Sequence, residues 1–130
     1  MHKYLVVLCL VACAVAGAAV AQEPADVSMV QLIANPSAFN GKLIRVTGFL
    51  RLEFEGNELY LHRDDYVHSV YKNGLWLELS RDESAKNMRL DQDYVTVIGV
   101  FDSRDQGHNG LTSGAIVKIQ RIELSPRRSR

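Results

Sequence analysis

Cysteine is almost absent from this 130-residue chain, and its two occurrences, Cys9 and Cys13, both lie near the N-terminus. They fall in an unbroken apolar run from residue 4 to residue 20, which follows a short basic start and ends in small residues. This order is typical of a secretory signal peptide. We therefore predict a signal peptide over residues 1–21. The exported chain would then have no thiol, which excludes a disulfide, a cysteine nucleophile and a cysteine-bound metal.

One other interpretation of the same segment stays open. Residues 10–13 have the form of a lipobox, in which Cys13 would carry a lipid and anchor the protein to a membrane. A retained transmembrane helix is disfavoured, because the apolar run is at the short limit for a span and ends in a good cleavage site. We expect an exported protein, periplasmic or secreted, with no transmembrane segment after signal cleavage.

The chain has no excess of charge of either sign, with 15 basic and 15 acidic residues. Three of the arginines lie in a short tail over residues 125–130, so the part expected to fold is acidic. Glu53, Glu55 and Glu58 crowd the predicted first hairpin, where phosphates would have to approach. Because the neutralisation of phosphates dominates nucleic-acid affinity, these charges argue against a nucleic-acid partner.

Two capping boxes mark predicted helix starts, Ser28 with Gln31 and Ser80 with Glu83. In each, the serine side chain and the side chain three residues later satisfy backbone N–H groups that lack a partner within the helix. The first helix is short, because Asn-Pro follows at residue 35. The second helix runs to about residue 90. Its expected core-facing residues are Ala85, Met88 and Leu90.

Five segments alternate apolar and polar residues, which is the pattern of strands with one buried face. They cover residues 42–50, 59–62, 75–79, 94–101 and 115–124. Gly48 lies inside the first segment and predicts a bulge or a sharp bend. The expected connections are a hairpin turn at residues 55–57, a polar loop at 63–74 and a Gly-rich solvated loop at 102–114.

The expected fold is mainly β, a five-stranded OB-fold-like Greek-key barrel with a short N-terminal helix and a helix between strands 3 and 4. Three meander strands, one helix and a closing hairpin fit that arrangement. The alternatives are an SH3-like barrel, which needs no helix at residues 80–90, and a small α+β sandwich. The chain length suits one domain. We place it at residues 28–124, after a flexible N-terminus at 22–27 and before a basic C-terminal tail at 125–130.

Two stretches, NPSAFNGKLIRVTGFL and YVTVIGVFD, carry a resemblance to known proteins. They combine a Gly41-Lys42 turn, a Val-Thr-Gly strand at residues 46–48 and a Val-x-Val-x-Gly strand at residues 95–99. In these features the chain resembles small exported bacterial OB-fold proteins of largely unassigned function, over most of residues 27–124. The shared motifs specify strands and bends, so the resemblance implies the fold and assigns no catalytic residue.

Aromatic side chains indicate a binding surface. Tyr60 and Trp76 lie on strand faces opposite the leucines predicted to fill the barrel, and the second and third strands of an OB-fold form its usual ligand platform. Packing beneath the first helix is the alternative for these rings. His62, His68 and His108 lie in or beside the flanking loops and complete the predicted ligand surface. We therefore expect a non-enzymatic exported binding module that recognises a small molecule, a glycan or an envelope protein.

The same loops allow a different hypothesis, a metal-binding protein or a metal-dependent hydrolase. Its candidate ligands are His62, Asp64, Asp65, His68 and His108. Their spacing is not diagnostic of a metal site. No nucleophile, base and orienting residue can be picked out, so an enzyme is disfavoured and no cofactor is predicted. A third hypothesis is a structural component of the envelope.

Overall fold

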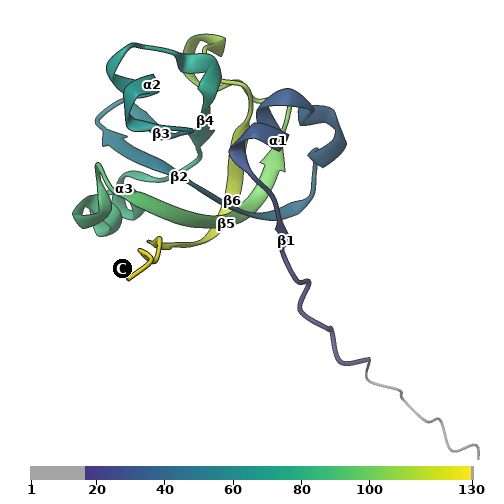
Figure 1. The fold of residues 1–130 in the computed structure, drawn as a ribbon. Coiled ribbons are helices and arrows are strands. Elements are labelled where there is room, and N and C mark those ends of the chain that lie inside the picture. The colour runs from purple at the N-terminus through teal and green to yellow at the C-terminus, as the bar shows by residue number, and fades with distance from the viewer. Residues whose placement is uncertain (1–16, 130) are drawn as a thin grey trace, which may run out of the picture.

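The computed structural model describes residues 17–129, which form a mainly β structure with short helices around a mixed sheet (Figure 1). The strands of this part are Ala25–Asp26 (β1), Leu43–Glu53 (β2), Gly56–Tyr60 (β3), Gly74–Leu77 (β4), Tyr94–Asp102 (β5) and Ala115–Leu124 (β6). Its helices are Met29–Ala34 (α1), Arg63–Val67 (α2) and Arg81–Asn87 (α3), and its 3₁₀ turns are Pro36–Phe39 (η1), Tyr71–Asn73 (η2), Met88–Leu90 (η3) and His108–Gly110 (η4). Cys9, Cys13 and most of the predicted signal peptide lie outside the described residues, so the leader stays a prediction. Between residues 17 and 129, no helix is long and apolar enough to cross a membrane.

The strands close into a ring through the long strand β2. Their order in the sheet is β1-β2-β3-β4-β6-β5, and β2 also pairs with β5. Residues 43–49 of β2 run antiparallel to β5, and residues 49–53 run antiparallel to β3. The β4–β6 pair is parallel. All five predicted strands are therefore present, while β1 forms within the segment 22–27 that we expected to be flexible and pairs with β2.

Gly48 lies beside the residue at which β2 changes partners, and the predicted bulge does not form there. The β2–β5 register runs unbroken through Gly48, whereas a register shift occurs in the β5–β6 pair between Ile98 and Val100. A β-carbon on Gly48 would stand 2.7 Å from both Leu59 Cγ and the Tyr60 carbonyl oxygen. Such distances are far inside van der Waals contact, so β2 can pass this close to β3 only without a side chain.

The interior of the ring is apolar and closed. Its fully buried members include Leu59, Leu77 and Val97, which belong to one cluster as the predicted fold requires. α1 packs on this cluster through Met29 and Leu32, which are 2% and 0% exposed. The capping box that begins α1 is formed, because the Gln31 N–H donates to Ser28 Oγ and the Ser28 N–H donates to the Gln31 side chain. The prediction for this helix is confirmed.

α3 contributes less to the core than we predicted. Its capping box forms, with the Glu83 N–H donating to Ser80 Oγ at 3.2 Å and the Ser80 N–H donating to Glu83 Oε2 at 2.7 Å. However, Ala85 is exposed and Met88 is 47% exposed, so both predictions of burial are wrong. Leu90 alone of the three reaches the core. The reason is that the α-helical period ends with α3 and gives way to the tighter η3 turn, which directs Leu90 inward.

The segment at residues 63–74 is folded into α2 and η2, where we predicted a polar loop. His62 is the N-cap of α2, and its backbone N–H donates to the Asp65 carboxylate at 3.0 Å. Asn73 of η2 donates to the other oxygen of the same carboxylate at 2.9 Å. This local bonding favours the helix, since an acceptor at the third helical position satisfies a backbone donor that otherwise has no partner.

Candidate functional site

A pocket with a volume of about 490 Å³ lies on the outer face of β3 and β4, between the β2–β3 hairpin and the β5–β6 loop. We call it the β3–β4 pocket. Its wall consists of Phe54, Tyr71, Trp76 and Leu111. Its rim carries Glu53, Glu55 and Glu58, with Gly56 between them, and His108 completes the lining. The pocket therefore combines aromatic rings with carboxylates.

Trp76 faces outward from β4, because its neighbours Leu75 and Leu77 face the interior. The indole is half-buried, and part of its cover comes from the β5–β6 loop. A β-carbon on Gly107 would stand 2.8 Å from Trp76 Cβ and 3.0 Å from two carbons of the indole. Gly107 adopts φ 68° and ψ −166°, a conformation that is essentially restricted to glycine. The loop backbone therefore lies directly against the tryptophan.

Hydrogen bonds tie the β5–β6 loop to β4 and η2. Lys72 Nζ donates to the Thr112 carbonyl oxygen at 3.3 Å, and Ser113 Oγ donates to the Lys72 carbonyl oxygen at 2.6 Å. The Trp76 N–H donates to the Gly114 carbonyl oxygen at 2.9 Å. These bonds hold the loop, and with it the imidazole of η4, beside the aromatic wall of the pocket.

The three rim carboxylates differ in their partners. Glu53 Oε1 accepts hydrogen bonds from Arg51 Nη2 and from the Tyr66 hydroxyl, each at 2.6 Å. The bond from Tyr66, followed by the bond from Arg51, holds the pKa of Glu53 below its ordinary value. Glu58 accepts from a buried tyrosine hydroxyl at 2.6 Å. Within the described part of the chain, the Glu55 side chain forms neither a hydrogen bond nor an ion pair, so its charge faces solvent.

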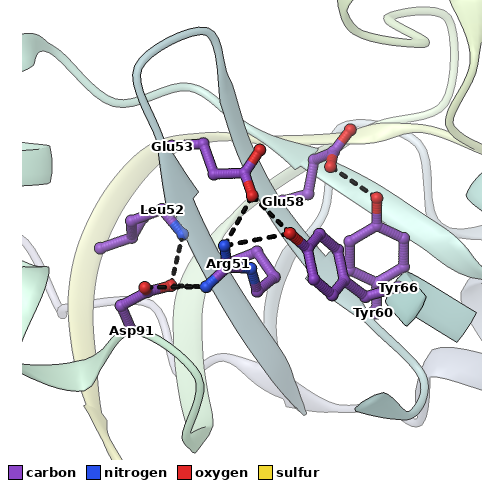
Figure 2. Close-up of polar contacts among 7 residues, drawn as sticks. All are labelled: Arg51, Leu52, Glu53, Glu58, Tyr60, Tyr66 and Asp91. Carbon is purple, nitrogen blue, oxygen red and sulfur yellow. Dashed lines mark hydrogen bonds and ion pairs between the residues drawn. The ribbon is translucent and has the colours of Figure 1, made fainter. Parts of the chain in front are cut away.

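Behind the rim, Arg51 joins three segments of the chain, as Figure 2 shows. Its side chain is 12% exposed, and Nη1 donates to both carboxylate oxygens of Asp91, at 3.0 and 2.8 Å. Tyr66 of α2 accepts from Nη2 at 3.1 Å, and its ring centroid lies 4.4 Å from the guanidinium carbon. Asp91 also accepts from the Leu52 N–H at 2.8 Å. This network holds Glu53 in place at the rim.

Sequence reasoning missed the Arg51 network. The alternation along β2 places Arg51 on the outer face, where an arginine is ordinarily solvated. Nothing in the spacing indicates that Asp91, 40 residues later, lies against it. The sequence feature that could have indicated a partly buried Arg51 was its position between two leucines, Leu50 and Leu52, both of which are buried. Arg51 Nε is buried and has no hydrogen-bond partner among residues 17–129. The resulting loss of stability is offset by the hydrogen bonds that the guanidinium makes to Asp91, Glu53 and Tyr66.

Tyr60 does not contribute to a ligand surface, contrary to our expectation, because its side chain is 0% exposed. Its ring meets the ring of Tyr66 edge-on, with the centroids 5.7 Å apart, and a β-carbon on Gly74 would stand 3.0 Å from it. Burial, followed by the hydrogen bond to Glu58, raises the pKa of the Tyr60 hydroxyl. The physical reason for the burial is α2, the helix that we did not predict, which brings Tyr66 against this face of β3.

The three candidate histidines lie at separate places. His108 lies in the β3–β4 pocket with Trp76. His62 borders a different depression, which it shares with Tyr94. His68 is the exposed C-cap of α2. Of the predicted ligand surface, the structure therefore brings together Trp76 and His108 and separates the other two imidazoles from them.

The alternative metal site is not assembled. The part of the chain that the structure describes includes no group of three or more His, Cys, Asp or Glu side chains that could hold a metal ion. Asp65 instead accepts from the His62 N–H and from Asn73, and Asp64 is exposed in the first turn of α2. The candidates that do not converge on one ion are His62, Asp64, Asp65, His68 and His108.

Comparison of the chain with protein-family models, with curated proteins and with solved structures finds no match in any of the three. The functional assignment therefore rests on the geometry of the β3–β4 pocket. That geometry offers aromatic faces for stacking, carboxylates for charge and hydrogen bonding, and one imidazole. These are the groups by which proteins hold and orient small ligands.

Proposed function

We propose that this protein is an exported, non-enzymatic binding module that holds its ligand in the β3–β4 pocket. The observation that carries the proposal is the meeting of Trp76 and His108 in one pocket with the exposed ring of Phe54. These residues come from β4, from the β5–β6 loop and from the β2–β3 hairpin, so tertiary folding is what brings them together. A concave site with aromatic walls and a few polar groups is the usual form of a ligand site.

We infer further that the ring of strands is of the OB-fold type. The order β2-β3-β4-β6-β5, the parallel β4–β6 pair and the position of α3 between β4 and β5 in the chain support this. An OB-fold binds ligands on its second and third strands, between the loops that follow strands 1 and 4. The corresponding elements here are β3, β4, the hairpin at Phe54 and the β5–β6 loop. The β3–β4 pocket lies at that position.

The ligand belongs to one of three classes: a small molecule, a glycan, or a group on an envelope protein. The pocket volume of about 490 Å³ falls within the range of small-ligand sites, roughly 300–1,000 Å³. A nucleic acid is disfavoured, because the rim glutamates would face its phosphates. The residues of the lining include no serine or cysteine that His108 could activate as a nucleophile, which favours binding over catalysis.

Retention of a ligand from the native envelope tests the proposal. The tagged protein is recovered from the envelope fraction, beside the variants Trp76→Leu and His108→Ala, and co-purifying molecules are identified by mass spectrometry. We expect a molecule that the wild type retains and that both variants lose. His68→Ala is the matched control, because His68 is exposed and lies outside the pocket, and it should retain the molecule. Equal retention by all four proteins, or by none of them, contradicts the proposal.

Export is part of the proposal, and the mass of the processed chain tests it separately. Cleavage after residue 21 produces an N-terminus at Gln22, whereas processing at the lipobox produces a lipidated Cys13. We expect the first product in the envelope or the medium. A full-length chain that stays in the cytoplasm contradicts export.

A further inference from the structure

We propose that the β3–β4 pocket recognises a small organic cation with more than one ammonium group, of the aliphatic polyamine class. The inference rests on the proposed function, since it takes the pocket to be a ligand site, and it adds the chemistry of the ligand. Three features of the pocket carry it: exposed aromatic faces, two carboxylates without basic partners (Glu55 and Glu58), and a lining that is richer in acceptors than in donors.

The aromatic wall offers ring faces to solvent. Phe54 is 86% exposed in the β2–β3 hairpin, and Tyr71 is 37% exposed on η2. Trp76 of β4 is half-buried. The faces of such rings carry negative potential that attracts ammonium and guanidinium groups. Phe54 shows this attraction within the chain, because the guanidinium carbon of Arg81 lies 5.6 Å from its ring centroid. Arg81 lines an adjacent depression that shares Glu53 and Phe54 with the β3–β4 pocket, and it is not among the residues that line the β3–β4 pocket.

The rim adds negative charge that the fold leaves largely uncompensated. Among the described residues, Glu53 is the rim glutamate with a basic partner, Arg51 at 2.6 Å. Glu55 and Glu58 have no ion pair within residues 17–129. Lys72 precedes the strand that carries the wall, but its ammonium group donates to carbonyl oxygens of the β5–β6 loop. The pocket therefore attracts a cation over an anion or a neutral molecule of the same size.

Two of the rim carboxylates border the same part of the pocket. Glu53 Oε2 and Glu58 Oε2 lie 3.9 and 4.0 Å from the point where a β-carbon on Gly56 would stand. The bonds from Arg51 and Tyr66 engage the other oxygen of Glu53, Oε1, and so leave Oε2 free to accept. Glu58 Oε2 already accepts from Tyr60, and a single ammonium group, which has three N–H donors, can contact both of these carboxylates. Glu55 lines the same rim and has no ion pair within residues 17–129, so it offers a separate carboxylate to a second ammonium group of the same ligand.

A neutral sugar matches this lining less well. Sugar hydroxyls both donate and accept, so a glycan site needs side-chain donors as well as acceptors. The donors on the lining side chains are limited to Tyr71, Trp76 and His108, whereas the rim presents carboxylates that only accept when ionised. Ammonium groups donate and do not accept. They therefore satisfy an acceptor-rich rim without leaving polar groups of their own unpaired.

Titration of the purified protein with spermidine, and separately with the neutral sugar cellobiose, tests the inference. The chain contains a single tryptophan, so its fluorescence reports on the β3–β4 pocket directly. We expect a saturable change of Trp76 emission with spermidine and no change with cellobiose. Spermidine affinity should fall about tenfold between low salt and about 0.5 M NaCl, because interactions of exposed charges are screened.

Charge-neutral variants locate the binding. Glu55→Gln and Glu58→Gln preserve side-chain size, and the amide oxygen at position 58 can still accept from Tyr60. Each should weaken spermidine binding by a factor of about 2 to 5, and the double variant by about tenfold, because an exposed charge pair contributes that much. Glu123→Gln is the matched control. Glu123 lies on β6 with a side chain 53% exposed, and it is outside the pocket lining, so its neutralisation should leave the affinity unchanged.

The outcomes separate this inference from the proposed function. Absence of a Trp76 response to spermidine overturns the inference, whatever else binds. A response to cellobiose instead, or an uncharged molecule retained from the envelope, overturns the inference and supports the binding module. Absence of both a Trp76 response and a retained molecule contradicts both proposals. Spermidine binding that survives unchanged in the double variant also overturns the inference, since the two rim glutamates without a basic partner would then play no part.

Discussion

Asp91→Ala tests the energetic argument behind the pocket rim. Asp91 is 18% exposed, accepts from Arg51 with both carboxylate oxygens, and accepts from the Leu52 N–H. The substitution leaves Arg51, which is 12% exposed, with Glu53 as its remaining carboxylate partner. It also removes the acceptor of the Leu52 N–H. Because Arg51 Nε already has no partner among the described residues, the network has little capacity to compensate.

The size of the effect follows from burial. Removal of one partner of a fully buried ion pair costs about 3–5 kcal/mol, and a buried N–H left without an acceptor costs about 1–3 kcal/mol. Both side chains here retain some contact with solvent, and Glu53 still offsets part of the charge on Arg51, so the lower ends of these ranges apply. We expect the free energy of unfolding to fall by about 3 kcal/mol. Asp91→Asn keeps an acceptor for Leu52 and should cost about half as much.

Urea denaturation followed by far-UV circular dichroism measures the loss. With an m-value of roughly 1.5 kcal/mol per M, the midpoint of Asp91→Ala should fall by about 2 M. Asp26→Ala is the control, because it breaks an Asp–Arg pair of 2.9 Å in which Asp26 is 79% exposed. Exposed pairs contribute little to stability, so its midpoint should stay near that of the wild type. Equal losses in the two variants would refute the argument that burial, rather than the presence of an ion pair, sets the energy.

Three further perturbations test the site. Tyr66 and Arg51 hold the pKa of Glu53 below its ordinary value of 4.5, so the stability from these contacts is present above pH 4.5 and is lost as the pH falls below it. Glu53→Gln should therefore be less stable than the wild type at neutral pH, with a difference that shrinks in urea titrations at pH 3. Burial and Glu58 raise the pKa of Tyr60 above its ordinary value of 10.0, so its contribution is present below pH 10 and declines as the pH rises further. Tyr60→Phe should lose about 1 kcal/mol at neutral pH and show a weaker alkaline decline; an unchanged alkaline profile would contradict this assignment. Gly107→Ala should destabilise the protein by about 1–3 kcal/mol, because of its backbone conformation and its contact with Trp76, and should shift Trp76 emission to longer wavelength. Wild-type emission in a folded Gly107→Ala variant would show that the loop does not cover the indole.

Features encoded by neighbouring residues were predicted correctly from the sequence. The capping boxes at Ser28 and Ser80 form, because their donors and acceptors lie three residues apart and need nothing else from the fold. The strand predicted at residues 115–124 forms as β6 with the same bounds. Its period of two is interrupted where the β5–β6 register shifts between Ile98 and Val100. The helical pattern overestimated the length of α3 and its contribution to the core. Nothing local marks the change from α-helix to 3₁₀ turn that exposes Met88.

The candidate site was predicted in part, and Tyr60 and Trp76 show why. Both residues lie on outward faces of their strands by alternation, and the sequence does not distinguish them. The structure buries Tyr60 against Tyr66 of α2 and leaves Trp76 partly exposed beside His108. Which outward ring is covered depends on where a separate helix packs, and that depends on the closed ring of strands.

The sequence by itself determined where the strands β2–β6 and the serine-capped helices α1 and α3 form, the acidic character of the β2–β3 hairpin, and the absence of cysteine after residue 13. These properties depend on residue type and on spacings of two to four residues. The tertiary structure alone decided that Arg51 meets Asp91, and that Phe54, Trp76 and His108 border one pocket. Such contacts join segments tens of residues apart, and their geometry exists only once β2 has paired with both β3 and β5 to close the ring.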